Sequence, residues 1–272
     1  MSLHSAALQH QAGLAFDTLA EQYDDIFTNS MIGRAQRHAV WTVASHIFQQ
    51  GDHILELNCG TGEDALFLAR LGMSVFACDA SEKMIAVATR RRAVEAPRSP
   101  VRFEVLPTEY IADSHIFGPF DGVFSNFSGL NCVADIGGVA RQLSTVLKPG
   151  GRFLLCVSSR VCLWEMAWFL THGRAGRAFR RWKGRSAASL GKLAVEVQYP
   201  TVSVLQKIFS PFFALRSWRG VGVAVPPSYL EHLARRYPKV LHNLRAIDSV
   251  ISVWPVFRGL GDHLLLLLER KA

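Results

Sequence analysis

The 272-residue sequence predicts an α/β fold built on a doubly wound parallel sheet. Short apolar segments alternate with helical segments up to about residue 160, at the spacing of strand–helix units. The apolar segments are hydrophobic on both faces, as are strands of a parallel sheet that is covered by helices on both sides. A glycine-bearing turn joins the first predicted strand to the helix that follows it.

The composition is that of a globular protein. Hydrophobic residues make up 49% of the chain and charged residues 19%, whereas a disordered chain would have far fewer apolar residues. The length suits one large domain, or one core domain with an insertion. No apolar run reaches the roughly 18 residues of a spanning helix. The first residues have no basic region followed by an apolar core, so no signal peptide is expected.

The five cysteines are expected to be reduced thiols of a cytoplasmic protein. No two of them form a C-x-x-C pair, so neither a disulfide framework nor a metal site is expected. The net charge of +8 is compatible with nucleic acid, an anionic membrane or an acidic ligand, and does not choose among them.

The first elements follow from apolar spacing. Residues 14–50 have apolar positions three and four apart, which predicts helical structure. Residues 1–50 are therefore predicted to form an N-terminal helical cap. Gly51 and Asp52 break this pattern. The apolar run 53–58 (HILELN) is predicted as the first strand, and 60–71 as the next helix.

The following units repeat this alternation. Residues 74–78 (SVFAC) predict the second strand. Residues 81–92 predict a helix with Ser81 as its N-cap and basic residues in its last turn. Residues 101–106 and 122–125 are apolar and predict the third and fourth strands.

The predicted core domain, 51–159, ends with one more unit. Residues 136–147 predict a helix, which is closed by Lys148-Pro149-Gly150-Gly151. Residues 152–157 (RFLLCV) predict the fifth strand.

The alternation then stops. Residues 160–192 contain eight Lys or Arg and one acid, Glu165, and 160–200 is predicted to be a basic and aromatic lid insertion. Residues 201–272 are predicted to complete the sheet and to supply substrate-side helices. In that part the predictions are strands at 202–205, 212–218, 221–225 and 263–269, and helical structure at 226–252.

The turn after the first predicted strand has two interpretations. Residues 60–65 fit G-x-G-x-x-A, the fingerprint of dinucleotide binding. However, Glu56, Glu63 and Asp64 would repel a pyrophosphate and would suit a cationic ligand such as S-adenosylmethionine. Acids in a first helical turn are also favoured by the helix dipole, so Glu56 is the more informative residue.

Asp79, 19 positions after Gly60, is placed to accept both hydroxyls of a ribose. This supports a nucleotide ligand without choosing the cofactor. The structural alternative is that Asp79 caps the helix near Ser81.

Together these segments resemble class I S-adenosylmethionine-dependent methyltransferases of the small-molecule type. The resemblance implies a Rossmann-like sheet of seven strands whose last strand is antiparallel, with S-adenosyl-L-methionine as cofactor. The segments that carry it are 54–72 (ILELNCGTGEDALFLARLG), 75–88, 120–133 and 147–157, with 16–27 as the cap segment.

The resemblance also implies a cofactor site. It places Asp79 on the ribose, Tyr23 over the cofactor, and Asn126 and Phe127 near the transferable methyl. The residues implied at the methionine part are Glu56, Cys59, Gly60 and Gly62, and those beside the adenosine are Ala80 and Met84.

Two positions depart from the family pattern. Asn58 stands where the family usually has a glycine, and Asn tolerates left-handed backbone better than most residues. Pro107 stands where the family often has an acid that meets the adenine amine. Contact with adenine is therefore expected from Thr108 or Glu109.

Methyl transfer needs a general base only if the acceptor must lose a proton. The start of the last strand lies at the cofactor edge in this fold, and His263, next to Asp262, is a candidate catalytic base there. The alternative is a histidine with a purely structural role at a strand end. Tyr23, His115 and His172 are weaker candidates.

The acceptor is expected to be a small apolar or aromatic molecule. Residues 161–171 are apolar and aromatic and precede the arginine-rich 174–185. This pair fits a lid over a flat molecule, an amphipathic segment in peripheral contact with an anionic membrane, or a nucleic-acid surface. Nucleic acid is disfavoured because Glu165 interrupts the apolar part and no RNA-binding module is present.

Three alternatives to that function stay open. The first is methylation of a membrane-associated lipid or quinone-like substrate. The second is a nicotinamide-dependent oxidoreductase, and the third is a binding protein that keeps the fold without catalysis. No sequence feature indicates the oligomeric state.

Overall fold

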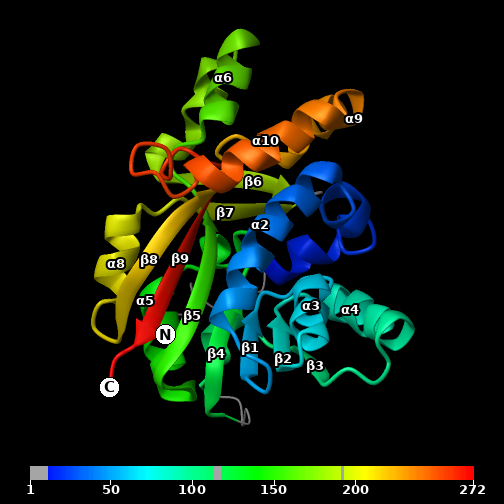
Figure 1. Cartoon of the computed structure of the whole chain (residues 1–272), viewed down its shortest axis with the longest axis vertical. Coiled ribbons are helices and arrows are strands. Elements are labelled where there is room, and N and C mark those ends of the chain that lie inside the picture. The colour runs from blue at the N-terminus through cyan, green and yellow to red at the C-terminus, as the bar shows by residue number, and fades with distance from the viewer. Residues whose placement is uncertain (1–11, 113–117, 191–192) are drawn as a thin grey trace.

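The computed structural model describes residues 12–112, 118–190 and 193–272. Its centre is a seven-stranded sheet of order β3-β2-β1-β4-β5-β9-β8 (Figure 1). The strands are β1 (His53–Leu57), β2 (Ser74–Asp79), β3 (Val101–Val105), β4 (Phe120–Ser125), β5 (Leu147–Ser158), β8 (Phe213–Val221) and β9 (His263–Arg270).

The strand directions confirm the predicted fold class. β1 pairs in parallel with β2 on one side and with β4 on the other, so the chain reverses its direction of winding at β1. β9 is antiparallel to both of its neighbours, β5 and β8. In a doubly wound sheet, ligands bind at the carboxyl ends of strands where the winding reverses, which here is between β1 and β4.

Helices cover both faces of the sheet. On one face α2 (Met31–Ile47), α3 (Glu63–Arg70) and α4 (Glu82–Glu95) pack on alternate strand residues such as Ile54. On the other face α5 (Ile136–Val146) and α8 (Val202–Phe209) pack on the intervening residues, such as Leu55. Strand side chains point alternately to the two faces, so strands of this kind must be apolar throughout.

The helix starts follow from short polar side chains. Ser81 caps α4, as predicted, and its side-chain oxygen accepts a hydrogen bond from Met84 N–H at 3.1 Å. Ser30 caps α2 in the same way, through Gly33 N–H at 2.9 Å. The N-terminal region is not one helix over 14–50, because a π-helical turn, η1 (Asp24–Thr28), and the cap at Ser30 interrupt it.

The segment after β5 forms a separate layer above the sheet (Figure 1). Its two strands, β6 (Arg185–Leu190) and β7 (Leu193–Gln198), pair only with each other among the described strands. Its helices are α6 (Leu163–Thr171), α7 (Ala175–Ala178) and η4 (Arg180–Lys183). In the parts that are described, no helix is both long and apolar enough to cross a membrane.

The last third differs most from the prediction. Residues 202–205 lie in helix α8 rather than in a strand, because Val202, Leu205 and Phe209 place their side chains on one helical face against the sheet. Residues 222–225 follow β8 as irregular backbone. The helical prediction for 226–252 is met by η5 (Ser228–Leu230), α9 (Glu231–Arg236) and α10 (Pro238–Ile251).

Candidate functional site

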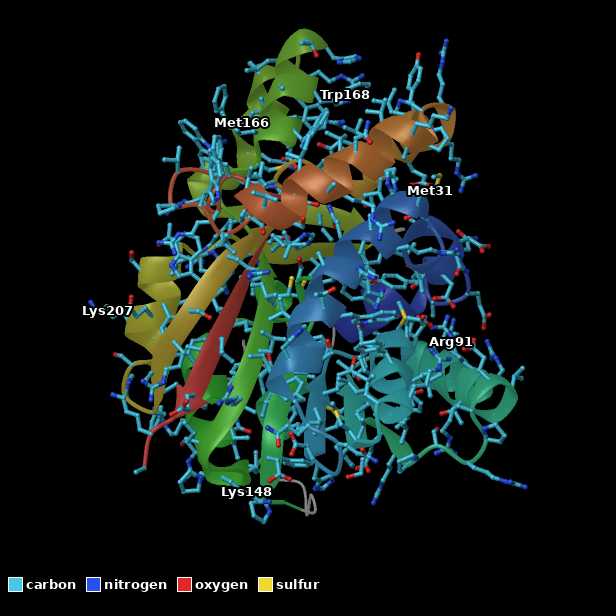
Figure 2. The ribbon with its side chains drawn as sticks, viewed as in Figure 1. Met31, Arg91, Lys148, Met166, Trp168 and Lys207 are labelled. Carbon is cyan, nitrogen blue, oxygen red and sulfur yellow. The ribbon has the colours of Figure 1, made fainter. Side chains whose placement is uncertain are left out.

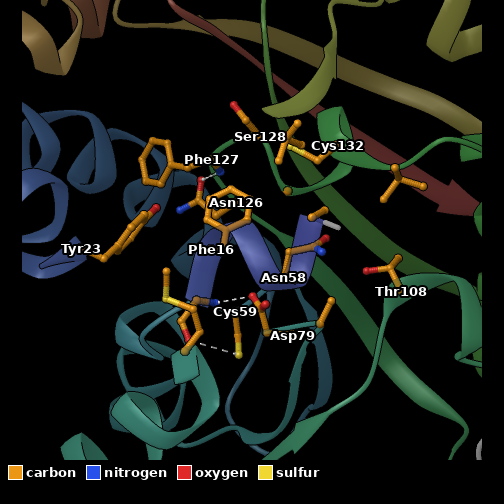
Figure 3. A pocket seen from close by; sticks show the side chains of 18 of the residues that line it. Phe16, Tyr23, Asn58, Cys59, Asp79, Thr108, Asn126, Phe127, Ser128 and Cys132 are labelled. Carbon is orange, nitrogen blue, oxygen red and sulfur yellow. Dashed lines mark hydrogen bonds between the residues drawn. The ribbon is translucent and has the colours of Figure 1, made fainter. Parts of the chain in front are cut away.

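A cavity of about 470 Å³ opens where β1, β2 and β4 end, beneath the N-terminal cap (Figure 3). Ligand cavities have volumes of roughly 300–1,000 Å³. Eleven of the thirteen residues predicted to bind a cofactor line this cavity. They are Tyr23, Asn58, Cys59, Gly60, Asp79, Ala80, Met84, Thr108, Glu109, Asn126 and Phe127.

The turn between β1 and α3 needs left-handed backbone at three positions. The φ angles are 55° at Asn58, 53° at Gly60 and 78° at Gly62, so Asn58 adopts the conformation expected of the family's glycine. A Cβ at Gly60 would meet nothing within 4 Å. A Cβ at Gly62 would lie 2.6 Å from the Phe103 ring. Gly62 does not line the cavity. Its missing side chain lets the turn pack closely against Phe103 of β3.

Asp79 ends β2 and holds the glycine turn in place. Its carboxylate oxygens accept hydrogen bonds from Gly60 N–H and from Ser81 N–H, both at 2.9 Å. Burial raises the pKa of Asp79, and these two donors oppose that shift. The same carboxylate lines the cavity, so it serves both the turn and whatever binds there.

Glu56 lies under the turn rather than in the cavity wall. It is 1% exposed, and its Oε2 has no hydrogen-bond partner in the part of the chain that the structure describes. Burial, with a smaller contribution from the charge of Asp64, raises the pKa of Glu56 well above its usual value. Glu56 was expected at the methionine part of a cofactor, but it is buried and does not line the cavity.

The two acids of the first turn of α3 are neutralised by arginines. Arg37 Nη1, from α2, lies 2.6 Å from Asp64 Oδ2, and both side chains are buried. Arg91 Nη1, from α4, lies 2.7 Å from Glu63 Oε2. Each of these two acids therefore has an arginine partner, and the sequence did not reveal it because Arg37 and Arg91 come from other helices and are distant along the chain.

Arg37 is a cavity residue that sequence reasoning missed. Its guanidinium carbon lies 5.6 Å from the centre of the Phe27 ring and 5.1 Å from that of Phe127. Asp64 also accepts hydrogen bonds from Trp41 Nε1 and Asn126 Nδ2. The sequence signal for this cluster is an arginine among the residues that α2 buries, next to the buried Gln36.

The cap is fixed to the turn by polar contacts. Asp24 accepts a hydrogen bond from Thr61 Oγ1 at 2.7 Å and pairs with Arg91. Asp17 accepts from Lys83 N–H at 3.0 Å. These contacts bring Tyr23 to the cavity, where burial raises the pKa of its phenol to about 12. Tyr23 is therefore a neutral hydroxyl at physiological pH.

The opposite wall is formed after β3 and near the start of α4. Met84 and Ala80 supply apolar surface there. Thr108 is 2% exposed, and its buried Oγ1 has no hydrogen-bond partner among the described residues. An unpartnered hydroxyl in a cavity wall is a site for a polar group of a ligand.

The wall after β4 has unusual backbone. Phe127 and Ser128 have φ angles of 45° and 71°, in the left-handed region that residues other than glycine rarely adopt. Such conformations cost of order 1–3 kcal/mol each and cluster at functional sites. Figure 3 shows both side chains at the cavity, with Asn126 between them and the glycine turn.

A second cavity of about 200 Å³ adjoins the first. Tyr23, Phe127, Ser158 and Ser228 line both cavities. His263 lines only the second one, and its ring centre lies 5.3 Å from that of Phe127. Sequence reasoning thus placed His263 at the correct edge of the sheet.

His263 is buried, and neither ring nitrogen has a hydrogen-bond partner among the described residues. Its Nδ1 lies 3.6 Å from Asp262 Oδ2. Burial and the charge of Arg181 lower the pKa of His263, whereas Asp262 opposes them. The ring is therefore neutral at neutral pH and able to accept a proton.

Buried ion pairs join the inserted segment to the start of β9. Arg181 Nη2 lies 2.7 Å from Glu165 Oε2 and 2.8 Å from Asp262 Oδ1. Glu165, the lone acid of the basic segment, also pairs with Arg180 at 2.7 Å. The buried side chain of Arg181 thus links this layer to Asp262, just before β9.

Of the weaker base candidates, Tyr23 lies at both cavities. His172 is exposed at the end of α6, with its Nδ1 2.7 Å from the Trp168 carbonyl oxygen. It lines neither cavity. His115 lies outside the described residues.

Comparison with known proteins finds sequence matches in the middle of the chain. Residues 54–151 match a family described as a methyltransferase domain. The demethylmenaquinone methyltransferase of Clavibacter sepedonicus is 34% identical over 146 residues, which are 54% of this chain and 57% of that protein. That of Thermobifida fusca is 32% identical over 146 residues, covering 54% and 60%. The chain thus matches less than two thirds of the length of these relatives.

Solved structures share the fold over most of the chain. The [4+2]-cyclase SpnF superposes with a TM-score of 0.65 at 15% identity, covering 97% of this chain and 96% of that one. A putative S-adenosylmethionine-dependent methyltransferase from Listeria monocytogenes gives 0.58 at 18% identity, covering 86% and 98%. At these identities the likeness shows the fold alone.

Proposed function

We propose that the chain, whose residues 54–151 match the methyltransferase domain family, is an S-adenosylmethionine-dependent methyltransferase of a small apolar or aromatic molecule. One observation supports this most strongly. The Asp79 carboxylate and the open backbone at Gly60 meet in the wall of one cavity, joined by a 2.9 Å hydrogen bond. A ribose acceptor and a close backbone approach are what an adenosyl ligand needs.

The residues present fit this cofactor. Asp79 would accept the ribose hydroxyls, and Thr108 Oγ1, which lacks a partner, would take a polar group of the adenine. Ala80 and Met84 would pack on the adenosine, and Tyr23 would cover it from the cap. Cys59, Asn58 and the Gly60 backbone would hold the methionine part, with Glu56 and Gly62 supporting the turn from behind.

The cofactor supplies an electrophilic methyl group on a positively charged sulfur. The chain's own residues orient the acceptor and exclude water, which are the main contributions to such a displacement. Phe127 and Tyr23 lie where the two cavities adjoin, since they line both, and would contact both the cofactor and the acceptor. His263, neutral and facing the second cavity, would accept the proton of an acidic acceptor.

The acceptor class is supported by the walls that the inserted segment contributes. Val195 and Val197 of β7, with Cys132 and Val133 after β4, add apolar surface to the larger cavity. The names of the relatives make a quinone-like aromatic ring a specific candidate acceptor. Because a quinol hydroxyl is acidic, this acceptor would also give His263 a proton to remove. Nucleic acid is not proposed as a substrate.

The nicotinamide alternative has less support. The match over 54–151 is to methyltransferases, and the terminal antiparallel strand fits the class I sheet.

All five cysteines are unpaired, which supports the proposal of a reducing, cytoplasmic location.

The test of this function is transfer of a labelled methyl group. The full-length protein would be incubated with methyl-labelled S-adenosylmethionine and a short-chain 1,4-naphthoquinol. We expect labelled product, and much less of it from Asp79→Ala when the cofactor is below saturation. If the protein binds the cofactor but labels no quinol, the quinone-like acceptor is wrong. If it binds no cofactor, the proposed function itself is wrong.

A further inference from the structure

An exposed apolar surface lies on α10 and the turn that follows it. Its members are exposed aliphatic and aromatic side chains, and we call them the α10 surface. They are Val240, Ile247, Val250, Val253, Trp254 and Val256. Val256 is 73% exposed and Trp254 50%. Neither cavity described above includes any of these residues.

The pattern is that of an amphipathic element. Val240, Ile247 and Val250 are seven and three residues apart, so they share one face of α10. The opposite face contains Leu241 and Asp248, which are buried. Solvent-facing positions of a surface helix are normally polar, so an apolar stripe here needs a covering partner.

The turn is held rigidly. Gly220 N–H donates to the Ser252 carbonyl at 2.8 Å, and Leu163 N–H donates to the Leu260 carbonyl at 3.1 Å. Between these anchors, Arg258 N–H donates to the Trp254 carbonyl at 2.9 Å. Trp254 and Val256 are thus displayed by ordered backbone.

Residues 237–260, which carry this surface, have more basic than acidic side chains. From 237 to 260 the only acid is Asp248. It is buried and accepts hydrogen bonds from Gly222 and Ala224 N–H. Lys239, Arg245 and Arg258 are in the same stretch. A symmetric pair of copies would bring these positive charges together, which disfavours self-association through this face.

We propose that the α10 surface is a docking site for an anionic lipid membrane. Apolar side chains enter the interface while basic neighbours meet the headgroups, each contributing about 1 kcal/mol near an anionic surface. Tryptophan is the residue most typical of that interface. The site is distinct from 161–171, the segment that the sequence indicated for membrane contact.

The α10 surface lies at the same end of the molecule as part of the larger cavity. Figure 1 shows α10 and its following turn at the same end of the molecule as β6 and β7. Ala188 of β6 and Val195 of β7 line the larger cavity. Docking through α10 would therefore bring the cavity end of the protein to the lipid, where apolar acceptors are concentrated.

The test is flotation of the full chain with vesicles. One set would contain phosphatidylcholine with about one-third phosphatidylglycerol and the other phosphatidylcholine alone, at about 0.05 M and about 0.5 M salt. The variant Trp254→Ser/Val256→Ser removes apolar area, and Lys239→Glu reverses a charge. The matched control is Val94→Ser, because Val94 is 82% exposed on α4, away from this end.

We expect wild type and Val94→Ser to float with the anionic vesicles at low salt only. The partition coefficient of the double serine variant onto anionic vesicles should be at least about tenfold lower than that of wild type. Lys239→Glu should reduce vesicle binding at low salt. Thermal melting confirms that each variant is folded. The proposal is overturned if wild type does not bind, if the serine variant binds equally well, or if wild type is a dimer that the serine variant converts to a monomer. Lipid binding is measured without cofactor, so it is independent of methyl transfer.

Discussion

Arg37 and Asp64 form a buried ion pair, with 2.6 Å between Nη1 and Oδ2, that joins the cap to the glycine turn. Arg37 belongs to α2, whose first residue, Met31, is labelled in Figure 2. The pair is enclosed further by Phe27 and Phe127, whose rings lie against the guanidinium. The burial of Asp64 therefore depends on a residue from a different part of the chain.

Replacing Arg37 should consequently destabilise the protein strongly. Arg37→Met leaves the Asp64 carboxylate buried and unpaired, which typically costs about 3–5 kcal/mol. Adding Asp64→Asn should recover more than half of that loss. Arg70→Met, which breaks the exposed Arg70–Glu95 pair, should cost at most about 1 kcal/mol. Urea unfolding of wild type, Arg37→Met, Asp64→Asn, the double variant and Arg70→Met gives these losses, and additive losses of the two single variants in the double variant would refute the coupling.

Asp79→Ala should weaken S-adenosylmethionine binding by about 1–3 kcal/mol, because two hydrogen bonds to a carboxylate are lost. Asp135→Ala is the matched control, since Asp135 accepts a backbone N–H at 2.8 Å outside the cavity. Calorimetric titration of both variants gives the comparison. Equal dissociation constants for wild type and Asp79→Ala would remove Asp79 from the ribose site.

Glu56→Gln should stabilise the protein without ligand, increasingly at higher pH. The folded-state pKa of Glu56 is raised by burial above the usual value of 4.5. Stability from its protonated form is present below that value and is lost as pH rises. The melting temperature of the variant should exceed that of wild type by about 2–4 °C per kcal/mol gained. The difference should grow from pH 5 to pH 8.

Glu95→Gln, at an exposed position, should show no such trend and serves as the control. A Glu56→Gln variant that is less stable than wild type at pH 8 would mean that Glu56 is charged and partnered in the folded protein.

His263→Asn should lower kcat by about 10²–10⁴-fold if the ring is the general base. The dissociation constant of the cofactor should change only a few-fold, because His263 lines the second cavity alone. Since burial lowers the pKa of His263 below 6.5, wild-type kcat/KM should fall only at pH values below 6.5. His172→Asn alters an exposed histidine and should leave the rate and its pH profile unchanged. If His263→Asn keeps the wild-type rate and pH profile, His263 is structural.

The first 160 residues reveal the sheet because the central β-strands there are apolar on both faces and alternate with helices, whereas the edge strand β3 also contains Arg102 and Glu104. The glycine turn after β1 was also predictable from local sequence, because the left-handed backbone at Gly60 and Gly62 favours glycine. The carboxyl ends of β1, β2 and β4 then bring 58–60, 79–80 and 126–127 together. Parallel winding alone implies this convergence.

The sequence could not show long-range compensation of charge. Glu63 and Asp64 suggested an anionic turn, but Arg91 and Arg37 neutralise them from two other helices. Glu165 interrupts an apolar run and counted against a nucleic-acid surface, and the sequence did not reveal that it is buried against Arg181 and Arg180. Residues 202–205 were misread because a short apolar run fits a strand and a buried helix turn equally well.

The central claim is that the cavity binds an adenosyl cofactor. Calorimetric titration of the full-length protein with S-adenosylmethionine, S-adenosylhomocysteine and NADH in parallel tests it most directly. The account predicts micromolar binding of both adenosyl ligands and none of NADH. Binding of NADH alone, or of none of the three, would contradict it.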